Sequence, residues 1–390
     1  AALSAVVDYQ PNEDLLGLQA KLFEPQGGLI AKLIGLNGEP SVGVSVDGSG
    51  PLSNWTGNLT ASVSSNQVFA LTATHQRISE STRKITVAGG GRPDQLLPDL
   101  YHQLFAGETR IDLATTLNDS GKIEIESASI DTGAMLFNAL GTYDPNGGNN
   151  ITANLMGTNG AIDLRLPLEG GYVQALVNGA EITLQGAAGS TRLNSAVSVQ
   201  TLIHPQARLD DVRLTATSQN LDIANQTGNI ATELSVFQSS IASPDLDRAM
   251  KAPLKLTAPL VLSSGKLAFE GVTLESASFG GTGSGTFDLN TNALTTNLRL
   301  FILPSVLPAD IAERLDGTIA VEAYVAHDGA SKTSVENLIV KSEVVEADGN
   351  LSIDGENILV KIGGRILDLS KLAPEAQGRI GFALAADGHI

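Results

Sequence analysis

The chain has 390 residues and a formal net charge of −18, from 24 Lys and Arg against 42 Asp and Glu. This acidity excludes the basic stripe that a nucleic-acid-binding protein needs, and the absence of cysteine excludes disulfides, thiolate metal sites and cysteine nucleophiles. Hydrophobic residues make up 42% of the chain but aromatic residues only 4%, so we expect an aliphatic core, and 41 glycines favour strands and turns.

The first hundred residues alternate apolar and polar side chains in short stretches. Leu3–Tyr9 and Val42–Val46 have this period of two, and the segment Pro25–Gly28 between them carries turn signals. Gly50-Pro51-Leu52, followed by Trp55, leads into a further strand. This part of the chain therefore predicts a series of β-strands, each wet on one face.

The segment Leu96–Leu113 combines a helical pattern with a strand pattern. Apolar residues recur at helical spacing from Leu97 to Phe105, Pro98 suits the start of a helix, and alternation begins at Ile111. The same combination recurs at Val306–Val321. We therefore predict short helical inserts near 96–106 and 306–315, and further candidate inserts at 244–250 and 369–377.

Two glycine-containing dipeptides predict β-hairpins. Asn159-Gly160 suits a two-residue type I′ turn, which would pair Leu155 with Leu164 and set apolar residues against each other. Asp354-Gly355 would likewise pair Leu351 with Ile358. A slip of one residue would turn either apolar set to water, so each hairpin predicts one aliphatic face and one polar face.

The signals recur at roughly one strand per 12–14 residues, a spacing typical of hairpin-connected strands, and predict about 28–32 strands. No linker or composition break interrupts the pattern, so we expect one continuous repetitive unit over 1–390. The fold class is predicted to be all-β: a long, mostly antiparallel sheet curled into an elongated open trough with an aliphatic interior and short helical inserts. The chain also begins and ends in strand-like patterns, which indicates a fragment of something longer.

No motif indicates catalysis. The five histidines (His75, His102, His204, His327 and His389) lie far from one another and from carboxylates at ligand spacing, so no metal site is expected. The glycine runs at 89–91 and 280–285 lack the Gly-Lys-Ser/Thr ending of a phosphate loop, and no Gly-x-Ser-x-Gly elbow occurs. We therefore predict neither an enzyme nor a resident cofactor.

The pattern resembles the periplasmic repeats of the TamB family, within the AsmA-like superfamily, and most closely its alphaproteobacterial members. The resemblance rests on the helical insert followed by Gly107, Thr109, Ile111 and Leu113, on the segment 50–59 with its Trp55, and on the strands 254–262 and 267–274. It implies a periplasmic location, a membrane anchor outside this segment, and a TamA-like outer-membrane barrel as partner. It also implies phospholipid transport between the two membranes and support for outer-membrane protein assembly.

An aliphatic sheet face that stays open needs a guest, and phospholipid acyl chains suit it because each buried CH₂ is worth about 0.8 kcal/mol. The residues predicted to contact lipid lie on the expected apolar face: Ile111, Leu113, Ile123, Ile125, Leu155, Ile162, Leu164, Leu166, Ile319, Val321, Leu351, Ile353, Ile358 and Val360. The alternative interpretation is a surface-exposed β-solenoid, either an adhesin passenger or a polysaccharide-binding or lyase-type protein.

Overall fold

A computed structural model describes residues 1–105, 107–168, 171–307, 309–313, 315, 317–373 and 375–389. Strands account for 68% of the structure and helices for 8%, which confirms the all-β prediction. All 24 strands belong to one antiparallel sheet that is not closed into a barrel. The chain divides into two compact units, Ala1–Leu202 (unit 1) and Ile203–Ile390 (unit 2).

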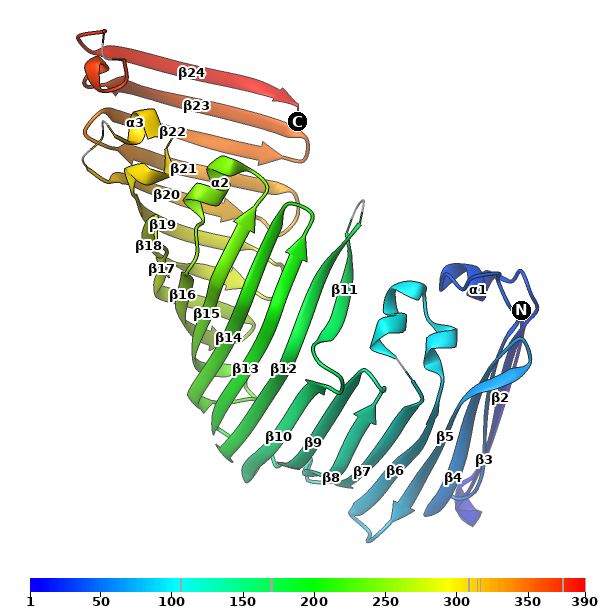
Figure 1. The fold of residues 1–390 in the computed structure, drawn as a ribbon. Coiled ribbons are helices and arrows are strands. Elements are labelled where there is room, and N and C mark those ends of the chain that lie inside the picture. The colour runs from blue at the N-terminus through cyan, green and yellow to red at the C-terminus, as the bar shows by residue number, and fades with distance from the viewer. Residues whose placement is uncertain are drawn as a thin grey trace. The chain divides into compact units, whose positions relative to one another are not determined.

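Unit 1 is built from strands that follow one another along the sheet in chain order up to β10 (Figure 1). Its strands are β1 (Ala2–Gln10), β2 (Leu15–Glu24), β3 (Val42–Pro51), β4 (Asn54–Val63), β5 (Asn66–Arg77), β6 (Thr82–Gly91), β7 (Thr109–Asn118), β8 (Ile123–Asp131), β9 (Met135–Tyr143), β10 (Gly148–Gly157), β11 (Ile162–Leu168), β12 (Gly171–Ala187) and β13 (Ser190–His204), which ends just inside unit 2. Its helices are η1 (Pro11–Glu13), α1 (Leu29–Leu33), η2 (Pro93–Leu96) and η3 (Asp99–Leu104).

Unit 2 repeats this antiparallel plan. Its strands are β14 (Ala207–Leu221), β15 (Thr227–Ile241), β16 (Leu254–Ser263), β17 (Lys266–Glu275), β18 (Phe279–Asp288), β19 (Leu294–Ile302), β20 (Ile319–His327), β21 (Lys332–Lys341), β22 (Val345–Asp354), β23 (Asn357–Ile366) and β24 (Ile380–His389). Its helices are α2 (Pro244–Ala249), η4 (Pro304–Val306), α3 (Ala309–Ala312) and η5 (Leu369–Lys371). The 24 strands are fewer than the predicted 28–32 because β12 to β15 run for 15 to 17 residues each.

The helices are short. The predicted insert near 96–106 holds two 3₁₀ helices, η2 and η3, with Pro98 at the N-cap of η3. The insert near 306–315 holds α3, while its Pro308 and the side chain of Ile311 lie outside the described residues. Helices α2 and η5 occupy the candidate inserts 244–250 and 369–377, and Pro374 again lies outside the described residues. Helix α1 follows the segment predicted as a turn and was not expected.

The prediction that Asn159-Gly160 forms a hairpin was wrong. Strand β10 pairs with β9 and with the second half of β12, whereas β11 pairs with the first half of β12. Leu155 therefore lies opposite Ala180, and Leu164 lies opposite Ala175. Residues 157–161 form an excursion between two collinear strands, since only one residue of β12 separates the two sets of pairs.

Hydrogen bonds hold this excursion in place. The Thr158 amide donates to the Ala134 carbonyl at 3.0 Å, and its hydroxyl donates to the Gly133 carbonyl at 2.7 Å. The residue thus contacts the turn between β8 and β9 instead of starting a new hairpin. Asn159 does not adopt the positive φ that a type I′ turn requires at its first central position.

The second hairpin exists with a different register. Strands β22 and β23 pair Leu351 with Val360 and Ile353 with Ile358, so the predicted pairing of Leu351 with Ile358 was wrong. The two-residue turn is Gly355-Glu356, with a φ of +59° at Gly355. Each residue of β22 pairs with a β23 residue two positions beyond the predicted partner. Because side chains alternate with a period of two, every side chain keeps the face that the sequence predicted.

Candidate functional site

Each unit presents one sheet face that carries almost no charge. Residues paired across an antiparallel ladder lie on the same face, and alternate residues of a strand lie on opposite faces, so the pairings assign each side chain to a face. We call these two surfaces the apolar face of unit 1 (β1 to β10) and the apolar face of unit 2 (β14 to β24). The opposite surfaces are the polar faces.

The apolar face of unit 2 is uncharged from Val212 of β14 to β24; at the start of β14 it carries Arg208 and Asp210, which form an ion pair of 2.9 Å with each other. Its central strands contribute Leu294, Leu298, Leu300, Ile319, Val321, Val325, Val335, Val340, Leu351, Ile353, Ile358, Val360 and Ile362, each paired in register with its neighbours. Glycines, threonines, alanines and the phenylalanines Phe269, Phe279, Phe287 and Phe382 fill most of the remaining positions, and His327 lies at one end. From Val212 to Gly388, the described strand residues with a charge lie on the polar face or within bulges.

The polar face of unit 2 carries paired charges. Lys255 contacts Glu233 at 3.1 Å, Arg299 contacts Glu322 at 3.0 Å, and Arg365 contacts Glu346 at 2.8 Å. These pairs join adjacent strands and are largely exposed, so each contributes at most about 1 kcal/mol. These charges keep this face in contact with water.

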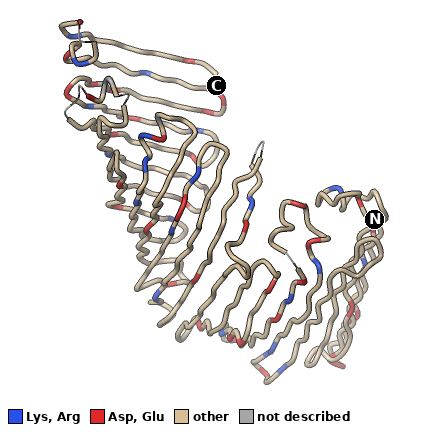
Figure 2. Tube along the Cα trace, in the orientation of Figure 1, with Lys and Arg blue, Asp and Glu red and all other residues tan. Residues whose placement is uncertain are grey.

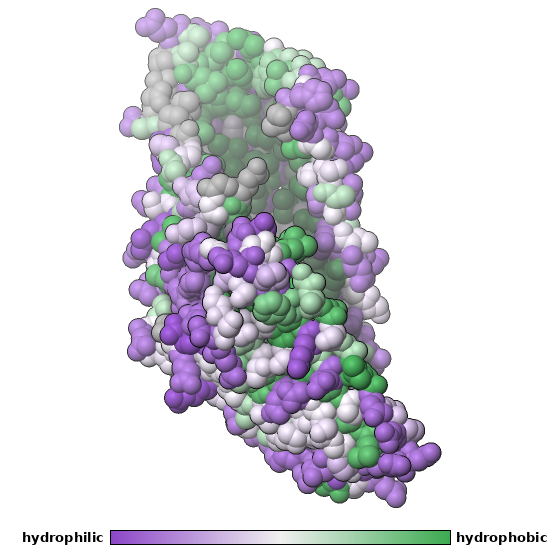
Figure 3. Space-filling model, turned by 90° about the vertical axis from the view of Figure 1, so that its right-hand side faces the viewer, coloured by the Kyte–Doolittle hydropathy of each residue, from purple (hydrophilic) through white to green (hydrophobic). Residues whose placement is uncertain are grey.

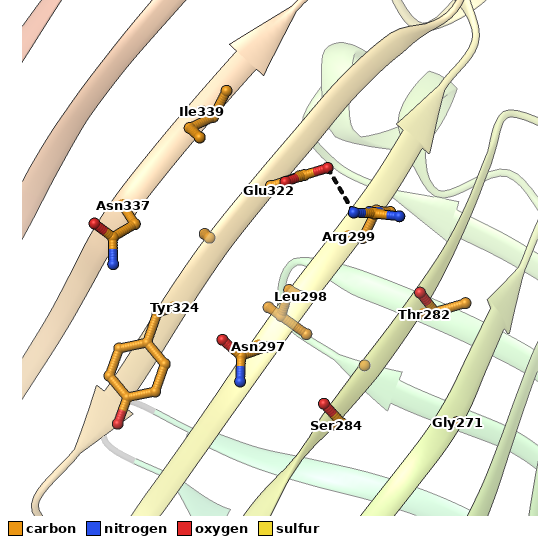
Figure 4. Close-up of a pocket in the computed structure, with 12 residues that line it drawn as sticks. Gly271, Thr282, Ser284, Asn297, Leu298, Arg299, Glu322, Tyr324, Asn337 and Ile339 are labelled. Carbon is orange, nitrogen blue, oxygen red and sulfur yellow. Dashed lines mark ion pairs between the residues drawn. The ribbon is translucent and has the colours of Figure 1, made fainter.

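A shallow cavity of about 480 Å³ lies on the polar face across β18 to β21 (Figure 4). The Arg299–Glu322 ion pair, Asn297, Tyr324 and Asn337 line it. The charges of Arg299 and Glu322 compensate each other across it.

Little covers the apolar faces. The one cluster of fully buried apolar residues in the described part of the chain consists of Ala31, Leu36 and Val42, with Ile34 and Leu96 packed against it. Most residues of the apolar faces are only half-buried, and on β24 Leu384 is 56% exposed. In Figure 3 hydrophobic side chains gather in a hollow between hydrophilic margins, at the height of β19 to β24 in Figure 1. A layer of helices or a second sheet that would close a sandwich core does not occur among these residues.

The predicted lipid-contact residues fall into three groups. Ile111, Leu113, Ile123, Ile125 and Leu155 lie on the apolar face of unit 1, as the register from β7 to β10 shows. Ile319, Val321, Leu351, Ile353, Ile358 and Val360 lie on that of unit 2. The third group consists of Ile162, Leu164 and Leu166 on β11, which lie on the same face as their β12 partners Val177, Ala175 and Val173. The excursion interrupts the register between β10 and β11.

The β11 residues differ in exposure. Ile162 is 4% exposed, and β11 packs beside the insert helix η3, whereas Leu166 is 52% exposed. Asp163 and Arg165 lie on the other face of the strand, joined by an ion pair of 2.8 Å, with Arg165 also over the Tyr172 ring. The predicted alternation thus holds within β11. The pairings do not establish that the apolar face of β11 continues that of β10.

The alternating pattern did not predict the three charged residues described on the apolar face of unit 1, which are Glu24, Arg77 and Arg83. Glu24 is 1% exposed and accepts hydrogen bonds from the α1 amides of Leu29 and Ile30, at 2.8 and 2.6 Å. The arginines flank the β5–β6 turn, and their common face follows from the register. Positive residues at equal distances from a turn were the signal that could have found them.

Charge is otherwise dispersed. Figure 2 shows basic and acidic residues interspersed along the strands of both units, without a single basic patch in the described part of the chain. No group of three or more metal-ligating side chains occurs among the described residues. The helices described in the structure are also all too short to cross a membrane.

No family model and no curated protein matches the chain.

Proposed function

We propose that the chain is a lipid-binding segment of a TamB-like envelope protein, whose apolar faces hold phospholipid acyl chains in the periplasm. The observation that carries this proposal is the apolar face of unit 2, which is uncharged from Val212 of β14 to β24 and has no covering layer in the described residues. An acyl chain lying across it would meet hydrocarbon on every strand. Each CH₂ removed from water would contribute about 0.8 kcal/mol.

The low aromatic content supports a carrier more than a selective receptor. Aliphatic side chains, glycines, threonines and a few phenylalanines line the apolar face of unit 2, and such a surface offers few directional contacts to fix one lipid species. Acyl chains could therefore exchange positions along the face without a large barrier. Passage of phospholipid between two membranes, assembly of outer-membrane proteins and docking to a TamA-like barrel are parts of the same proposal.

The β-solenoid alternative has less support. Parallel solenoids stack rungs in one direction, whereas the strand pairs of this sheet are antiparallel and joined by hairpins. The polar faces carry compensated ion pairs in place of the clustered acidic or basic residues that a polysaccharide lyase would need.

A pair of neighbouring residues tests the acyl-chain proposal. A photoreactive residue at position 360, on the apolar face, should crosslink phospholipid, whereas one at position 361, on the polar face, should not. Leu351→Asp places an unpaired carboxylate beside Val360 and should reduce that crosslinking at least tenfold, because burying a charge against hydrocarbon costs several kcal/mol. Ser352→Asp, one residue along on the polar face, is the matched control and should leave it unchanged. Equal crosslinking at positions 360 and 361 would refute the proposal.

A further inference from the structure

The apolar face of unit 1 carries two positive charges whose presence the sheet itself does not explain. Of its three charged residues, Glu24 is fully occupied by the α1 amides. Arg77 and Arg83 remain, at the end of β5 and the start of β6. The described charged residues that the register places on the apolar face of unit 2 are Arg208 and Asp210, which have opposite signs and form an ion pair of 2.9 Å with each other.

The two arginines lie directly opposite each other. The β5–β6 register pairs Arg77 with Arg83, and the next pair inward on the same face is His75 with Ile85. Like charges directly opposite on a ladder destabilise it, so a structural role would favour a neutral or acidic partner. An anion placed between the guanidinium groups would remove this repulsion.

The existing partners leave donors available. Arg83 contacts Asp119 through Nη1, at 2.7 Å from Oδ1, and both side chains are about half exposed. Arg77 is exposed and makes no ion pair with a described residue; hydrogen bonds from Ser53 lower the pKa of the Asp14 carboxyl, and the charge of Arg77 adds to this effect. A guanidinium has five N–H donors, so several remain free at this point.

The surroundings are amphipathic. Trp55 pairs with His75 on the same face, and its indole Nε1 donates to the Leu16 carbonyl at 3.1 Å. His75 is itself hydrogen-bonded to the Leu52 carbonyl through Nδ1 at 2.6 Å. The arginines therefore mark the boundary where the hydrocarbon surface of β4 to β6 gives way to water at the strand ends.

We propose that Arg77 and Arg83 bind the phosphate of a phospholipid whose acyl chains lie on the apolar face of unit 1. This inference rests on the proposed function and adds a head-group site to it. Guanidinium groups recognise phosphate oxygens with two parallel hydrogen bonds, and their long stems can lie along an apolar surface. The lipid enters or leaves the face at this end of the strands, with its head group held in water and its tails on Ile85 and the strands beyond.

The test separates the head group from the tails. The purified chain is titrated with dihexanoyl phosphatidic acid, with dihexanoylglycerol, which has the same tails without phosphate, and with glycerol 3-phosphate, which has no tails. The wild-type chain should bind the phosphatidic acid about tenfold more tightly than dihexanoylglycerol. Arg77→Gln/Arg83→Gln should lose this preference and bind the phosphatidic acid about tenfold more weakly, a change of ~1.4 kcal/mol, with dihexanoylglycerol binding unchanged.

The matched control removes the same two charges from the polar face. Lys84 lies beside Arg83 on β6 and Arg110 lies on the adjacent strand β7, both on the polar face. The variant Lys84→Gln/Arg110→Gln should keep the wild-type preference. If the Arg77/Arg83 variant kept the preference for phosphatidic acid, the head-group site would be overturned while acyl-chain binding stood. An equal loss of affinity for phosphatidic acid and dihexanoylglycerol would also overturn the head-group site. Glycerol 3-phosphate binding as tightly as the phosphatidic acid would show a site for soluble phosphate instead. Absence of binding to both lipids in the wild-type chain would overturn this inference and the proposed function together.

Discussion

The apolar faces of unit 1 and unit 2 follow one pattern but treat charge and packing differently. In unit 1 the helices α1 and η2 pack against strand β3 through Ala31, Leu36 and Leu96, and a buried carboxylate secures α1. In unit 2 the charges described on the face, Arg208 and Asp210, compensate each other in an ion pair, and the strands from β16 to β24 carry none on that face. The comparison shows that the alternating pattern makes the face, while a few residues outside the pattern decide what covers its ends.

Removing the buried carboxylate should affect unit 1 alone. In Glu24→Ala the α1 amides of residues 29 to 31 lose their acceptor in a site that water does not reach, at a cost of about 3 kcal/mol. Hydrogen exchange should show faster exchange across α1 with β19 to β23 unchanged. Glu24→Gln, which keeps one acceptor oxygen, should lose roughly half as much. Unaltered exchange in α1 would show that the cluster of Ala31, Leu36 and Val42 holds the helix without Glu24.

Glycines under aromatic rings should be the sensitive points of unit 2. A Cβ at Gly285 would meet the Thr295 carbonyl oxygen and lie 2.9 Å from Phe269 Cζ, so Gly285→Ala should destabilise unit 2 by about 2 kcal/mol. A Cβ at Gly363 would meet nothing within 4 Å, so Gly363→Ala should change stability by less than about 0.5 kcal/mol. Thermal or denaturant unfolding measures both.

The same arrangement occurs in unit 1, where the Trp55 ring covers Gly48 and Gly57. Gly57→Ala should therefore behave like Gly285→Ala. If it proved neutral, the two units would differ in packing as well as in charge.

The smallest expected effect concerns carboxylates that are stabilised in different ways. Hydrogen bonds from Lys84 and then Thr116 lower the pKa of Glu126 in unit 1, whereas backbone amides of Ala330 and Lys332 lower that of Asp328 in unit 2. A lowered pKa in the folded state contributes stability above the ordinary pKa of the group and loses it as pH falls through the folded pKa. Both groups are exposed, so the gain in stability is slight.

Salt should distinguish the two. High ionic strength screens the Lys84 ammonium and should raise the pKa of Glu126, while the amide hydrogen bonds to Asp328 should keep its pKa low. Carboxyl titration followed by NMR at low and high salt measures this. Lys84→Gln should reproduce the effect of salt on Glu126, and an equal response of Asp328 would contradict the assignment of causes.

Local pattern predicted which side chains share a face. The prediction of faces around Leu351 and Val360 holds although the register differs, because each residue pairs two positions away from its predicted partner and so stays on its original face. Turn chemistry was less informative: the β22–β23 turn is centred one residue later than predicted, at Gly355-Glu356. Sequence reasoning also placed the helical inserts correctly in the chain, although η2, η3 and α3 are shorter than expected.

The amino-acid sequence by itself therefore determined the all-β class, the two chemically distinct faces and the positions of the inserts. These features depend on local repeats, of two residues in strands and of three to four residues in helices. Tertiary structure decided which strands are partners. In the predicted hairpin Ala153 would lie opposite Leu166 of β11, and in the structure it lies opposite Ile182 of β12. Both partners are apolar, so hydrophobic alternation could not decide which strand pairs with β10. That choice depends on long-range competition for backbone hydrogen bonds, which a 17-residue strand wins because it can serve β10 and β11 together.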